Sequence, residues 1–355
     1  MIRVAYTLEQ CWHDVPGGTA VATLRVLDEL LRRDDVEIVG VAGRHRASPD
    51  AAFVPAIDVA QLPIARPWLY ETWNRVGWPT VERATGPVDV CHSTIAIPAA
   101  TKAPHVVTVH DAAFVHTPER FTRHGVRVMT AGLDRCRTAD LVLCPSQATA
   151  DDLTSMGFDP ERLRVVPWGV EQVAVHADDV ERVRSTHGLP DEFVLFVGTI
   201  EPRKNLPRLA AAMQHLEHRM PLVVAGATGW GDVEVDGAAD VRFLGFVPHG
   251  ELHALYAAAS VFAYPSLQEG FGMPILEAMT TDTPVVTSRG GATEEAAGGA
   301  ASLVDPTDVE SIATGIDAAL ERRDELVAAG RRRVSDASWA SAAAATADAY
   351  REVLS

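Results

Sequence analysis

The sequence predicts two doubly wound α/β domains, the first covering residues 1–168 and the second residues 169–338. Short runs rich in β-branched residues alternate with segments of helical periodicity along the whole chain, which is typical of helices packed on parallel sheets. A chain of 355 residues is long enough to fill two hydrophobic cores. The stretch VPWGV at 166–170 contains Pro and Gly, and the alternation restarts after it, so we place the boundary there.

The first half alternates between the two patterns from its first residues. Its predicted strands are Ile2–Leu8, Glu37–Gly43, Val88–Ser93, His105–His110, Leu141–Pro145 and Leu163–Pro167. Its predicted helices are Ala20–Arg33, Leu69–Ala84, Gly125–Arg137 and Ala148–Met156. The last of these begins after Ser146, a residue type that caps helices, and stops at Gly157.

The second half repeats this organisation and closes with an Ala-rich helix. Its predicted strands are Phe193–Gly198, Leu222–Gly226, Val241–Val247, Val261–Pro265, Pro284–Thr287 and Ala301–Val304. Its predicted helices are Leu206–Leu216, Gly250–Ala259, Pro274–Met279 and Asp308–Arg322, and Trp339–Leu354 forms a separate segment at 339–355. Ligands of doubly wound domains bind at the carboxyl ends of the strands, so we expect the active site in a cleft between the two domains.

Composition and charge narrow the class of partner. Hydrophobic residues make up 47% and charged residues 22% of the chain, as in ordinary globular proteins. The net charge of −17 is uneven, because the first 170 residues hold 17 basic and 20 acidic residues, whereas the remainder holds 14 and 28. The acidic second half argues against a nucleic acid partner, and the nearly neutral first half leaves room for an anionic partner.

Targeting, cysteine and metal signals are weak throughout. The N-terminal MIRVAYTL reads as a strand rather than a signal peptide, and no run of about 18 apolar residues could cross a membrane. We therefore expect a cytoplasmic protein. Its four scattered cysteines predict buried, reduced thiols, and its 13 histidines show no ligand spacing, so we expect no metal and no cofactor.

The stretch YPSLQEGFGMPILEAM at 264–279 predicts an anion site flanked by two carboxylates. Gly270 and Gly272 allow the backbone to approach a ligand, and the helix opened by Pro274 directs its first N–H groups and its positive dipole end toward it. Glu269 lies in the loop, and Glu277 is expected in the first helical turn. A phosphate of the ligand could bind the backbone amides, and hydroxyls of the ligand could donate to the two carboxylates. This combination suits a sugar nucleotide. Glu277 could also have no role in binding, because acidic residues are ordinarily favoured in the first turn of a helix by the helix dipole.

A second constellation is GTIEPRKN at 198–205, which directly follows a strand. Arg203 and Lys204 lie where the strand gives way to a helix, and Asn205 is expected to cap that helix. Arg offers a planar fork and Lys a point charge, so together they suit a diphosphate. The alternative is a solvated turn with two ordinary basic residues.

Two strand ends in the first half carry further candidates. Gly17 and Gly18 form a turn before a predicted helix, which suits phosphate or close substrate approach. The full GxGxxG pattern is absent, and a plain connecting loop is the competing and stronger interpretation. His110 and Asp111 end the strand VVTVHD, where the histidine would face the cleft and Asp111 would orient it or bind a hydroxyl. A structural histidine is the competing interpretation.

Basic and aromatic side chains cluster between residues 68 and 127. Arg120, Arg123, His124 and Arg127 fall on one side of a predicted helix and would suit an anionic acceptor or a lipid headgroup; a solvated face is the alternative. The nearby aromatic residues would stack on sugars, touch a membrane interface or simply pack in the core; they are Trp68, Tyr70, Trp73 and Trp78.

With these residues in view, the chain resembles the retaining glycosyltransferases of the GT-B fold, family 4 type. The matching segments cover nearly the whole chain in family order: Gly17-Gly18, VTVHD (107–111), CPSQATADDL (144–153), VVPWGVE (165–171), FVGTIEPRKNLPRL (196–209), FLGFVP (243–248), EGFGMPILEAM (269–279) and LVDP (303–306). The motif GTIEPRKN resembles that of the mannosyltransferase-like branch of the family. Trp168 departs from the family pattern, since an Asn is common before Gly-Val.

The resemblance implies a fold of two Rossmann-like domains facing a central cleft. The first would bind the acceptor and the second the nucleotide sugar, and the last helix would cross back to the first domain. Arg203 and Lys204 would hold the donor diphosphate and stabilise it as the leaving group. Glu277 would bind the ribose hydroxyls, and the base would lie near Gly245–Val247, with Val247 among its contacts.

The same resemblance assigns the sugar end of the site. The donor sugar would be held by Glu269, by Gly270 and by the backbone amides of Phe271 and Gly272. His110 would contact it from the other domain. Gly17 and Gly18 would line the cleft beside the phosphates and the acceptor. In the front-face retaining reaction attributed to this family, the leaving phosphate takes the acceptor proton, so neither a metal nor a protein base is expected.

The function predicted from these points is transfer of a hexose, with mannose as the first candidate. The donor would be GDP-mannose or a UDP-sugar and the acceptor a glycan or a lipid-linked glycan. Peripheral contact with the inner face of the plasma membrane through the first domain is left open. The alternatives are a GT-B sugar-nucleotide epimerase or phosphorylase, or a non-catalytic two-lobed sugar-binding protein. A pyridoxal phosphorylase needs a Schiff-base lysine, and the chain contains only Lys102 and Lys204.

Overall fold

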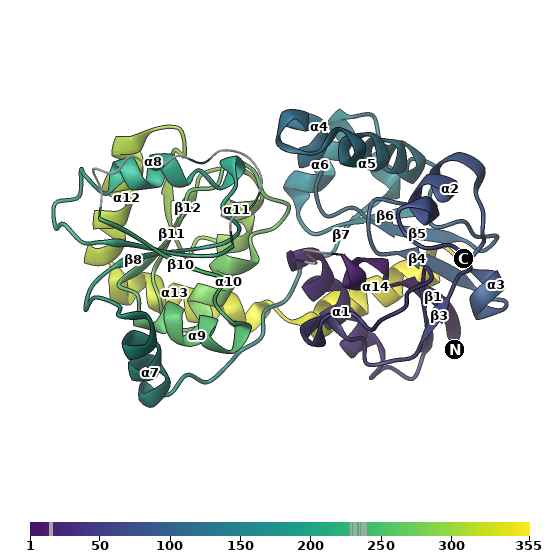
Figure 1. The fold of residues 1–355 in the computed structure, drawn as a ribbon, viewed down its shortest axis with the longest axis horizontal. Coiled ribbons are helices and arrows are strands. Elements are labelled where there is room, and N and C mark those ends of the chain that lie inside the picture. Colours follow the sequence, from purple (N-terminus) through teal and green to yellow (C-terminus); the bar gives the residue numbers. More distant parts are fainter. Residues whose placement is uncertain (14–16, 228, 230–232, 234, 236–239) are drawn as a thin grey trace. The chain divides into compact units, whose positions relative to one another are not determined.

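The computed structural model describes residues 1–355 except 14–16, 228, 230–232, 234 and 236–239. The chain forms two compact units. One consists of Met1–Gly169 together with Trp339–Ser355, and the other of Val170–Ser338. Each unit contains one parallel sheet with helices on both faces (Figure 1). The predicted fold class, two doubly wound α/β domains, is therefore confirmed.

The first unit is built on a seven-stranded sheet in the order β3-β2-β1-β4-β5-β6-β7. The strands are β1 Ile2–Thr7, β2 Val36–Ala42, β3 Val59–Gln61, β4 Val90–Ser93, β5 His105–Thr108, β6 Leu141–Cys144 and β7 Leu163–Val165. The order runs outward in both directions from the β1–β4 pair. This pair is the topological switch point, where the connections on the two sides leave a crevice at the carboxyl ends of the strands.

The helices of the first unit include the last helix of the chain. They are α1 Gly17–Leu30, α2 Trp68–Val76, α3 Glu82–Thr85, α4 Ala113–His116, α5 Arg123–Cys136, α6 Gln147–Ser155 and α14 Trp339–Glu352, and a 3₁₀ turn covers Glu9–Trp12. Helix α14 packs along α1 (Figure 1). Its Tyr350 hydroxyl lies 2.7 Å from Nδ1 of His92 on β4, so the last helix joins the core of the first unit.

The second unit has a six-stranded sheet in the order β10-β9-β8-β11-β12-β13. Its strands are β8 Val194–Val197, β9 Leu222–Ala225, β10 Val241–Gly245, β11 Val261–Tyr264, β12 Val285–Ser288 and β13 Ser302–Val304. Its helices are α7 Ala177–His187, α8 Leu206–Ala212, α9 His249–Ala258, α10 Met273–Thr280, α11 Gly291–Ala297, α12 Val309–Glu321 and α13 Arg323–Asp336. Here the switch point lies between β8 and β11.

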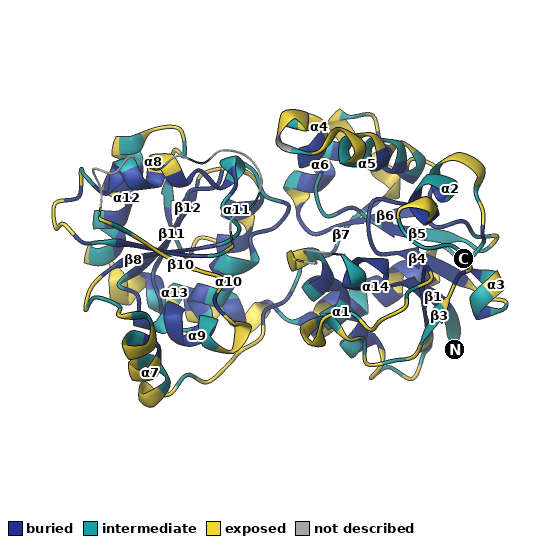
Figure 2. Ribbon diagram, in the orientation of Figure 1, coloured by how far each residue is buried: buried dark blue, intermediate teal, exposed yellow. Residues whose placement is uncertain are grey.

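The central strands are buried on both faces (Figure 2). Every residue of β8 and of β11 is buried. Helices cover both sides of a parallel sheet, so its strands appear in the sequence as continuous apolar runs rather than alternating ones. The four cysteines are free and buried.

Several helix predictions need correction. The single helix expected over Leu69–Ala84 is wrong, because α2 ends at the left-handed Gly77 (φ 62°) and α3 starts only at Glu82. Helices α4, α11, α13 and α7 were not predicted, and the surface of α7 is almost entirely polar. Its ends are nevertheless marked, by a capping box at His176 and by Gly188 (φ 58°).

Two buried histidines should make the first unit sensitive to acid. Burial lowers the pKa of His92 to about 3 and that of His105 to about 4. In the unfolded chain both would titrate near 6.5. Their stabilising contribution is therefore complete above about pH 6.5 and is lost as the pH falls toward these folded-state values. We expect the melting temperature to fall between pH 7 and pH 4, as measured by circular dichroism.

The matched variants are His92→Gln and His218→Gln. The side chain of His218 is 72% exposed, so its replacement should leave the slope of melting temperature against pH unchanged. His92→Gln should flatten that slope, since one buried group that binds a proton only on unfolding is removed. An unchanged slope in His92→Gln would show that the acid sensitivity has another source.

Candidate functional site

A polar cluster occupies the switch point of the second unit. A 3₁₀ turn, Pro202–Lys204, follows β8, and the glycine loop 265–272 follows β11. These two strands are neighbours in the sheet. The structure thus brings Arg203, Lys204 and Glu269 together at the place where doubly wound domains bind ligands.

Glu269 is the centre of this cluster. Its Oε1 accepts a hydrogen bond from Lys204 Nζ at 2.7 Å, and its Oε2 accepts one from Arg203 Nη1 at 2.7 Å. The hydroxyl of Tyr264 donates to Glu269 Oε1 at 3.0 Å and itself accepts from Lys204 Nζ. Arg203 also pairs through Nε with Glu201 Oε1 at 2.8 Å. Two cations and two carboxylates therefore balance one another.

The cluster is shielded from solvent but not closed. The exposed fraction is 9% for the side chain of Lys204, 8% for that of Glu269 and 20% for that of Arg203. Burial alone would raise the pKa of Glu269, but the charges of Lys204 and Arg203 lower it to about 2. The carboxylate is thus ionised at neutral pH and lies between the two cations.

Sequence reasoning missed Glu201 and Tyr264. Tyr264 is the last residue of a buried strand, and the need of a buried Tyr hydroxyl for a hydrogen-bond partner was the available signal. Asn205 does occupy the N-cap position of α8, as expected, but its side chain makes no capping hydrogen bond; its Nδ2 donates instead to the carbonyls of Pro265 (2.9 Å) and Pro306 (2.6 Å). The residue thereby ties the turn after β8 to the loop after β11.

Glu277 lies deeper in its helix than the sequence suggested. Helix α10 begins at Met273, so Glu277 is not in the first turn and that expectation is wrong. Its Oε2 accepts a hydrogen bond from the hydroxyl of Tyr256 at 3.0 Å. Burial raises its pKa, against the opposing effect of this bond and of His249. Gly272, just before the helix, has a φ of +111°, which strongly favours glycine.

The remaining predicted residues of the second unit surround this helix and strand β10. Phe271 is buried beside Gly270, and Val247 is buried two residues after Gly245, which ends β10 with a φ of +70°.

Among the described residues, no three His, Cys, Asp or Glu side chains are grouped to hold a metal ion.

The predicted residues of the first unit lie near its own switch point. Gly17 (φ +60°) and Gly18 are exposed and begin α1. His110 follows β5 by two residues, and its Nε2 lies 2.8 Å from the carbonyl oxygen of Thr94, which follows β4. The carboxylate of Asp111 accepts from the backbone N–H of Ala113 at 3.0 Å and so shapes the start of α4.

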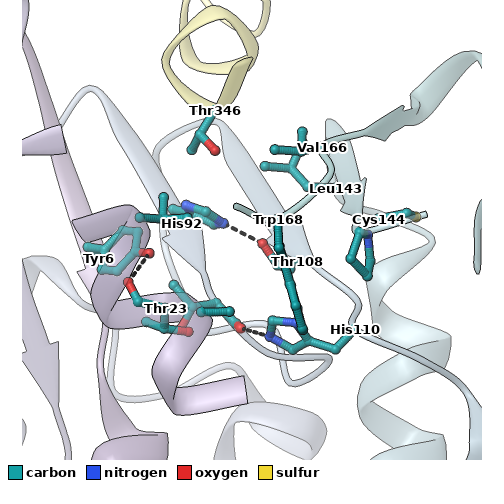
Figure 3. A pocket seen from close by; sticks show the side chains of 14 residues that line it. Tyr6, Thr23, His92, Thr108, His110, Leu143, Cys144, Val166, Trp168 and Thr346 are labelled. Atoms are coloured by element: carbon teal, nitrogen blue, oxygen red, sulfur yellow. Dashed lines mark hydrogen bonds between the residues drawn. The ribbon is translucent and has the colours of Figure 1, made fainter. Parts of the chain in front are cut away.

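A small cavity of about 30 Å³ adjoins His110, which is room for roughly one water molecule. Figure 3 shows polar groups from separate elements around it, including His92 and Thr108, whose Nε2 and Oγ1 lie 2.8 Å apart. Tyr6 donates its hydroxyl proton to the carbonyl of Thr23 at 3.0 Å. The Trp168 ring lies against His110, with 5.3 Å between the ring centres.

The aromatic and basic residues of 68–127 separate into core and surface. Tyr70 and Trp73 are buried, whereas Trp68 and Trp78 are exposed. Arg123, His124 and Arg127 are exposed near the start of α5, and Arg120 lies in a separate 3₁₀ turn, Pro118–Arg120. No helix in the described part of the chain has the length and apolar character needed to span a membrane.

Comparisons with known proteins define the class. A family model described as "Glycosyl transferases group 1" matches residues 178–333, and one described as "Glycosyltransferase Family 4" matches residues 16–172. The O-antigen chain mannosyltransferase B of Escherichia coli is 34% identical over 269 residues, which are 69% of this chain and 70% of that protein. The fold and these matches define a GT-B glycosyltransferase. Within that class, the chain belongs to glycosyltransferase family 4, which confirms the resemblance.

One further relative and two solved structures extend these comparisons, the structures for the fold alone. D-inositol 3-phosphate glycosyltransferase 2 of Catenulispora acidiphila is 34% identical over 238 residues, covering 60% of this chain and 56% of that protein. The fold is shared with sucrose-phosphate synthase of Thermosynechococcus elongatus (TM-score 0.74, 20% identity, 100% and 99% coverage). It is also shared with Anabaena HepE in complex with UDP and glucose (TM-score 0.68, 20% identity, 95% of each chain).

Proposed function

We propose that this glycosyltransferase moves a hexose, with mannose as first candidate, from a nucleotide diphosphate sugar to a glycan or lipid-linked acceptor, with retention of configuration. The observation that carries the proposal is the Arg203–Glu269–Lys204 cluster at the β8–β11 switch point. The similar Escherichia coli protein is an O-antigen chain mannosyltransferase, which supports mannose, and GDP-mannose or a UDP-sugar is the donor class we expect.

Donor binding would proceed by exchange of anions. Glu269 now neutralises both cations, and an incoming diphosphate, with more negative charge, competes for them. Once displaced, the Glu269 carboxylate can accept hydrogen bonds from hydroxyls of the donor sugar. The backbone of residues 270–272 lies beside it on the same loop. The cluster thus changes from an internal ion pair into a site with separate positions for phosphate and sugar.

The same groups would stabilise the transition state. Cleavage of the bond between the anomeric carbon and the diphosphate oxygen places negative charge on the leaving group and positive charge on the sugar. Arg203 and Lys204 are fixed in position and stabilise the departing diphosphate without a metal ion. The acceptor oxygen bonds to the anomeric carbon on the face that the diphosphate leaves, and a phosphate oxygen takes the acceptor proton. No protein base is needed.

Other residues would bind the ends of the donor. Glu277 would accept hydrogen bonds from the ribose hydroxyls, and Val247 would lie near the base. His110 would contact the donor sugar, while Gly17 and Gly18, exposed at the start of α1, would admit the phosphates and the acceptor.

A thermal-shift screen tests the donor class. GDP-, UDP-, ADP- and dTDP-sugars are added in turn, each once with a divalent metal ion and once with EDTA. A ligand present at about 100 times its Kd should stabilise the folded state by about 2.7 kcal/mol and raise the melting temperature. We expect one nucleotide to stand out, with the same shift in EDTA. A response only in divalent metal would overturn the metal-independent mechanism, and no response to any nucleotide would overturn the proposed donor site.

We also propose peripheral contact between the first unit and an anionic membrane. Trp68 and Trp78 are 69% and 44% exposed, and Arg127 is exposed beside α2, where it pairs with Glu71. Exposed Trp and Arg side chains suit a lipid headgroup layer. Co-sedimentation with vesicles containing anionic lipid should occur and should weaken in Trp68→Ser. Equal binding to neutral vesicles, or none at all, would contradict the proposal.

A further inference from the structure

A buried glutamine connects two elements of the first unit's switch point. Gln10 is 1% exposed and lies in the 3₁₀ turn that follows β1. Its side-chain Nε2 donates to Thr23 Oγ1 on α1 at 2.8 Å and to Thr94 Oγ1 after β4 at 2.6 Å. The amide thus uses both of its protons to join the helix that starts at Gly17 to the end of a central strand.

Thr94 is held so firmly that its carbonyl oxygen has a defined position. Its backbone N–H donates to Thr7 Oγ1 at 2.9 Å, and its hydroxyl donates to the Thr7 carbonyl at 2.6 Å. The hydroxyl proton is committed to that carbonyl, so toward Gln10 the oxygen can only accept. The hydrogen bond from Gln10 to Thr94 and the two bonds from Thr94 to Thr7 therefore each have a fixed direction. Thr7, Thr94 and Gln10 are all buried, and a hydrogen bond is electrostatically stronger in the protein interior than in water.

The Thr94 carbonyl determines which nitrogen of His110 carries a proton. A carbonyl oxygen only accepts, so Nε2, at 2.8 Å, must be the protonated nitrogen. Burial lowers the pKa of His110, although the Thr94 contact and Asp111 act in the opposite direction, and the ring is therefore neutral near pH 7. Nδ1 then carries a lone pair, and it is a shielded atom without a hydrogen-bond partner among the described residues. Trp168 limits rotation of the ring from one side (Figure 3).

We propose that Gln10 is a positioning residue that, through Thr94, locks His110 in the Nε2–H tautomer, so that Nδ1 is presented as a hydrogen-bond acceptor for a hydroxyl of the donor sugar. This inference rests on the proposed function, which places the sugar at His110. The same bridge fixes α1, and with it Gly17 and Gly18 at the start of that helix, relative to His110. A neutral acceptor at this position selects for a ligand group that can donate, which a hydroxyl does and a fluorine or carbonyl substituent does not.

The tautomer can be read directly by NMR. The complete chain is labelled with ¹⁵N-histidine, and the His110 signals are identified by their absence in His110→Gln. Protonated and unprotonated ring nitrogens resonate in well-separated regions, so the spectrum reports the tautomer without reference to activity. We expect wild-type His110 to show protonated Nε2 and unprotonated Nδ1 at pH 7. An Nδ1–H tautomer or a doubly protonated ring would overturn the proposal.

Variants distinguish control of the His110 tautomer by Gln10 and Thr94 from a general effect of these residues on packing. Gln10→Leu and Thr94→Val remove polar atoms at similar volume and should give mixed tautomers and a roughly tenfold lower kcat/KM, the size expected for loss of one buried hydrogen-bond arrangement. Thr94→Ser keeps the hydroxyl and should retain the wild-type spectrum and most of the activity. Gln147→Leu, at an exposed glutamine on α6, is the matched control. Wild-type tautomer signals in both Gln10→Leu and Thr94→Val would show that the bridge does not set the tautomer.

The outcomes also distinguish this inference from the proposed function. Suppose that the spectra show the expected His110 tautomer but no nucleotide sugar supports transfer. This result would confirm that Gln10 and Thr94 set the tautomer and would refute the proposed donor. Transfer with undiminished rate in His110→Gln would refute the role of the locked imidazole and leave the donor cluster of the second unit unaffected. If Gln10→Leu fails to fold, the wild-type spectrum and the Thr94→Val and Thr94→Ser pair decide the question.

Discussion

Lys204→Ala should lower the rate of sugar transfer by a factor of about 100 to 1000, the range found when one fixed donor to a developing negative charge is removed. The ammonium is buried between Glu269 and the Tyr264 hydroxyl, and water cannot replace it at the same position. The loss should appear in kcat as well as in kcat/KM, because the charge on the leaving diphosphate is greatest in the transition state. Steady-state assays with the donor identified by the thermal-shift screen give both constants.

The variant also removes half of a buried ion pair, so its stability must be measured in parallel. Loss of one partner from such a pair costs about 3 kcal/mol or more. Circular dichroism should show a folded protein with a lower melting temperature, and assays should be run well below it. Arg219→Ala removes an exposed cation of the same unit and serves as the control. Transfer at a rate close to wild type in folded Lys204→Ala would exclude Lys204 from the diphosphate site.

Glu277→Ala should weaken binding of the nucleotide by about 10- to 100-fold, as expected for lost hydrogen bonds to a charged group. If Glu277 binds the ribose, the loss should be seen with the free nucleoside diphosphate as well as with the sugar nucleotide. Isothermal titration calorimetry with both ligands measures it. Transfer at subsaturating donor should fall by a similar factor.

Glu269→Ala provides the contrast. If Glu269 serves the sugar, this variant should bind the nucleoside diphosphate at least as tightly as wild type, since its carboxylate no longer competes for Arg203 and Lys204, and yet transfer sugar poorly. Glu310→Ala, at an exposed glutamate on α12, is the neutral control. Equal nucleotide affinity in Glu277→Ala and wild type would remove Glu277 from the ribose, and weaker affinity in Glu269→Ala would contradict the exchange of anions.

The strands could be predicted from the sequence because both faces of each sheet are covered. Runs such as Val194–Val197 and Val261–Tyr264 have no solvent-facing positions to interrupt them. Helix α7 could not be found in the same way, because only Val183 in it is buried and no apolar stripe exists. The helix expected across Gly77 failed because periodicity on both sides masked a left-handed turn.

The candidate site could be predicted only as far as its residues follow strand ends. Arg203, Lys204 and Glu269 follow neighbouring strands of one sheet, and the rule that parallel strands end at one edge of a sheet was sufficient to group them. His110 follows a strand of the other sheet. Glu201 and Tyr264 add contacts that depend on side-chain reach across neighbouring strands. Gln10 was beyond sequence reasoning, because its significance arises from hydrogen bonds to Thr23 and Thr94, the latter 84 residues away.

The return of α14 to the first unit has a consequence for biosynthesis. Tyr350 satisfies His92 in the middle of the first unit, and α14 covers α1 there, yet both become available only after residues 170–338 have been translated. The second unit is contiguous and can fold as soon as it leaves the ribosome. The first unit is translated first, but it lacks the cover over α1 and the Tyr350 partner of His92 Nδ1 until the last helix has been translated. The part of the protein that is made first is therefore the last to be completed.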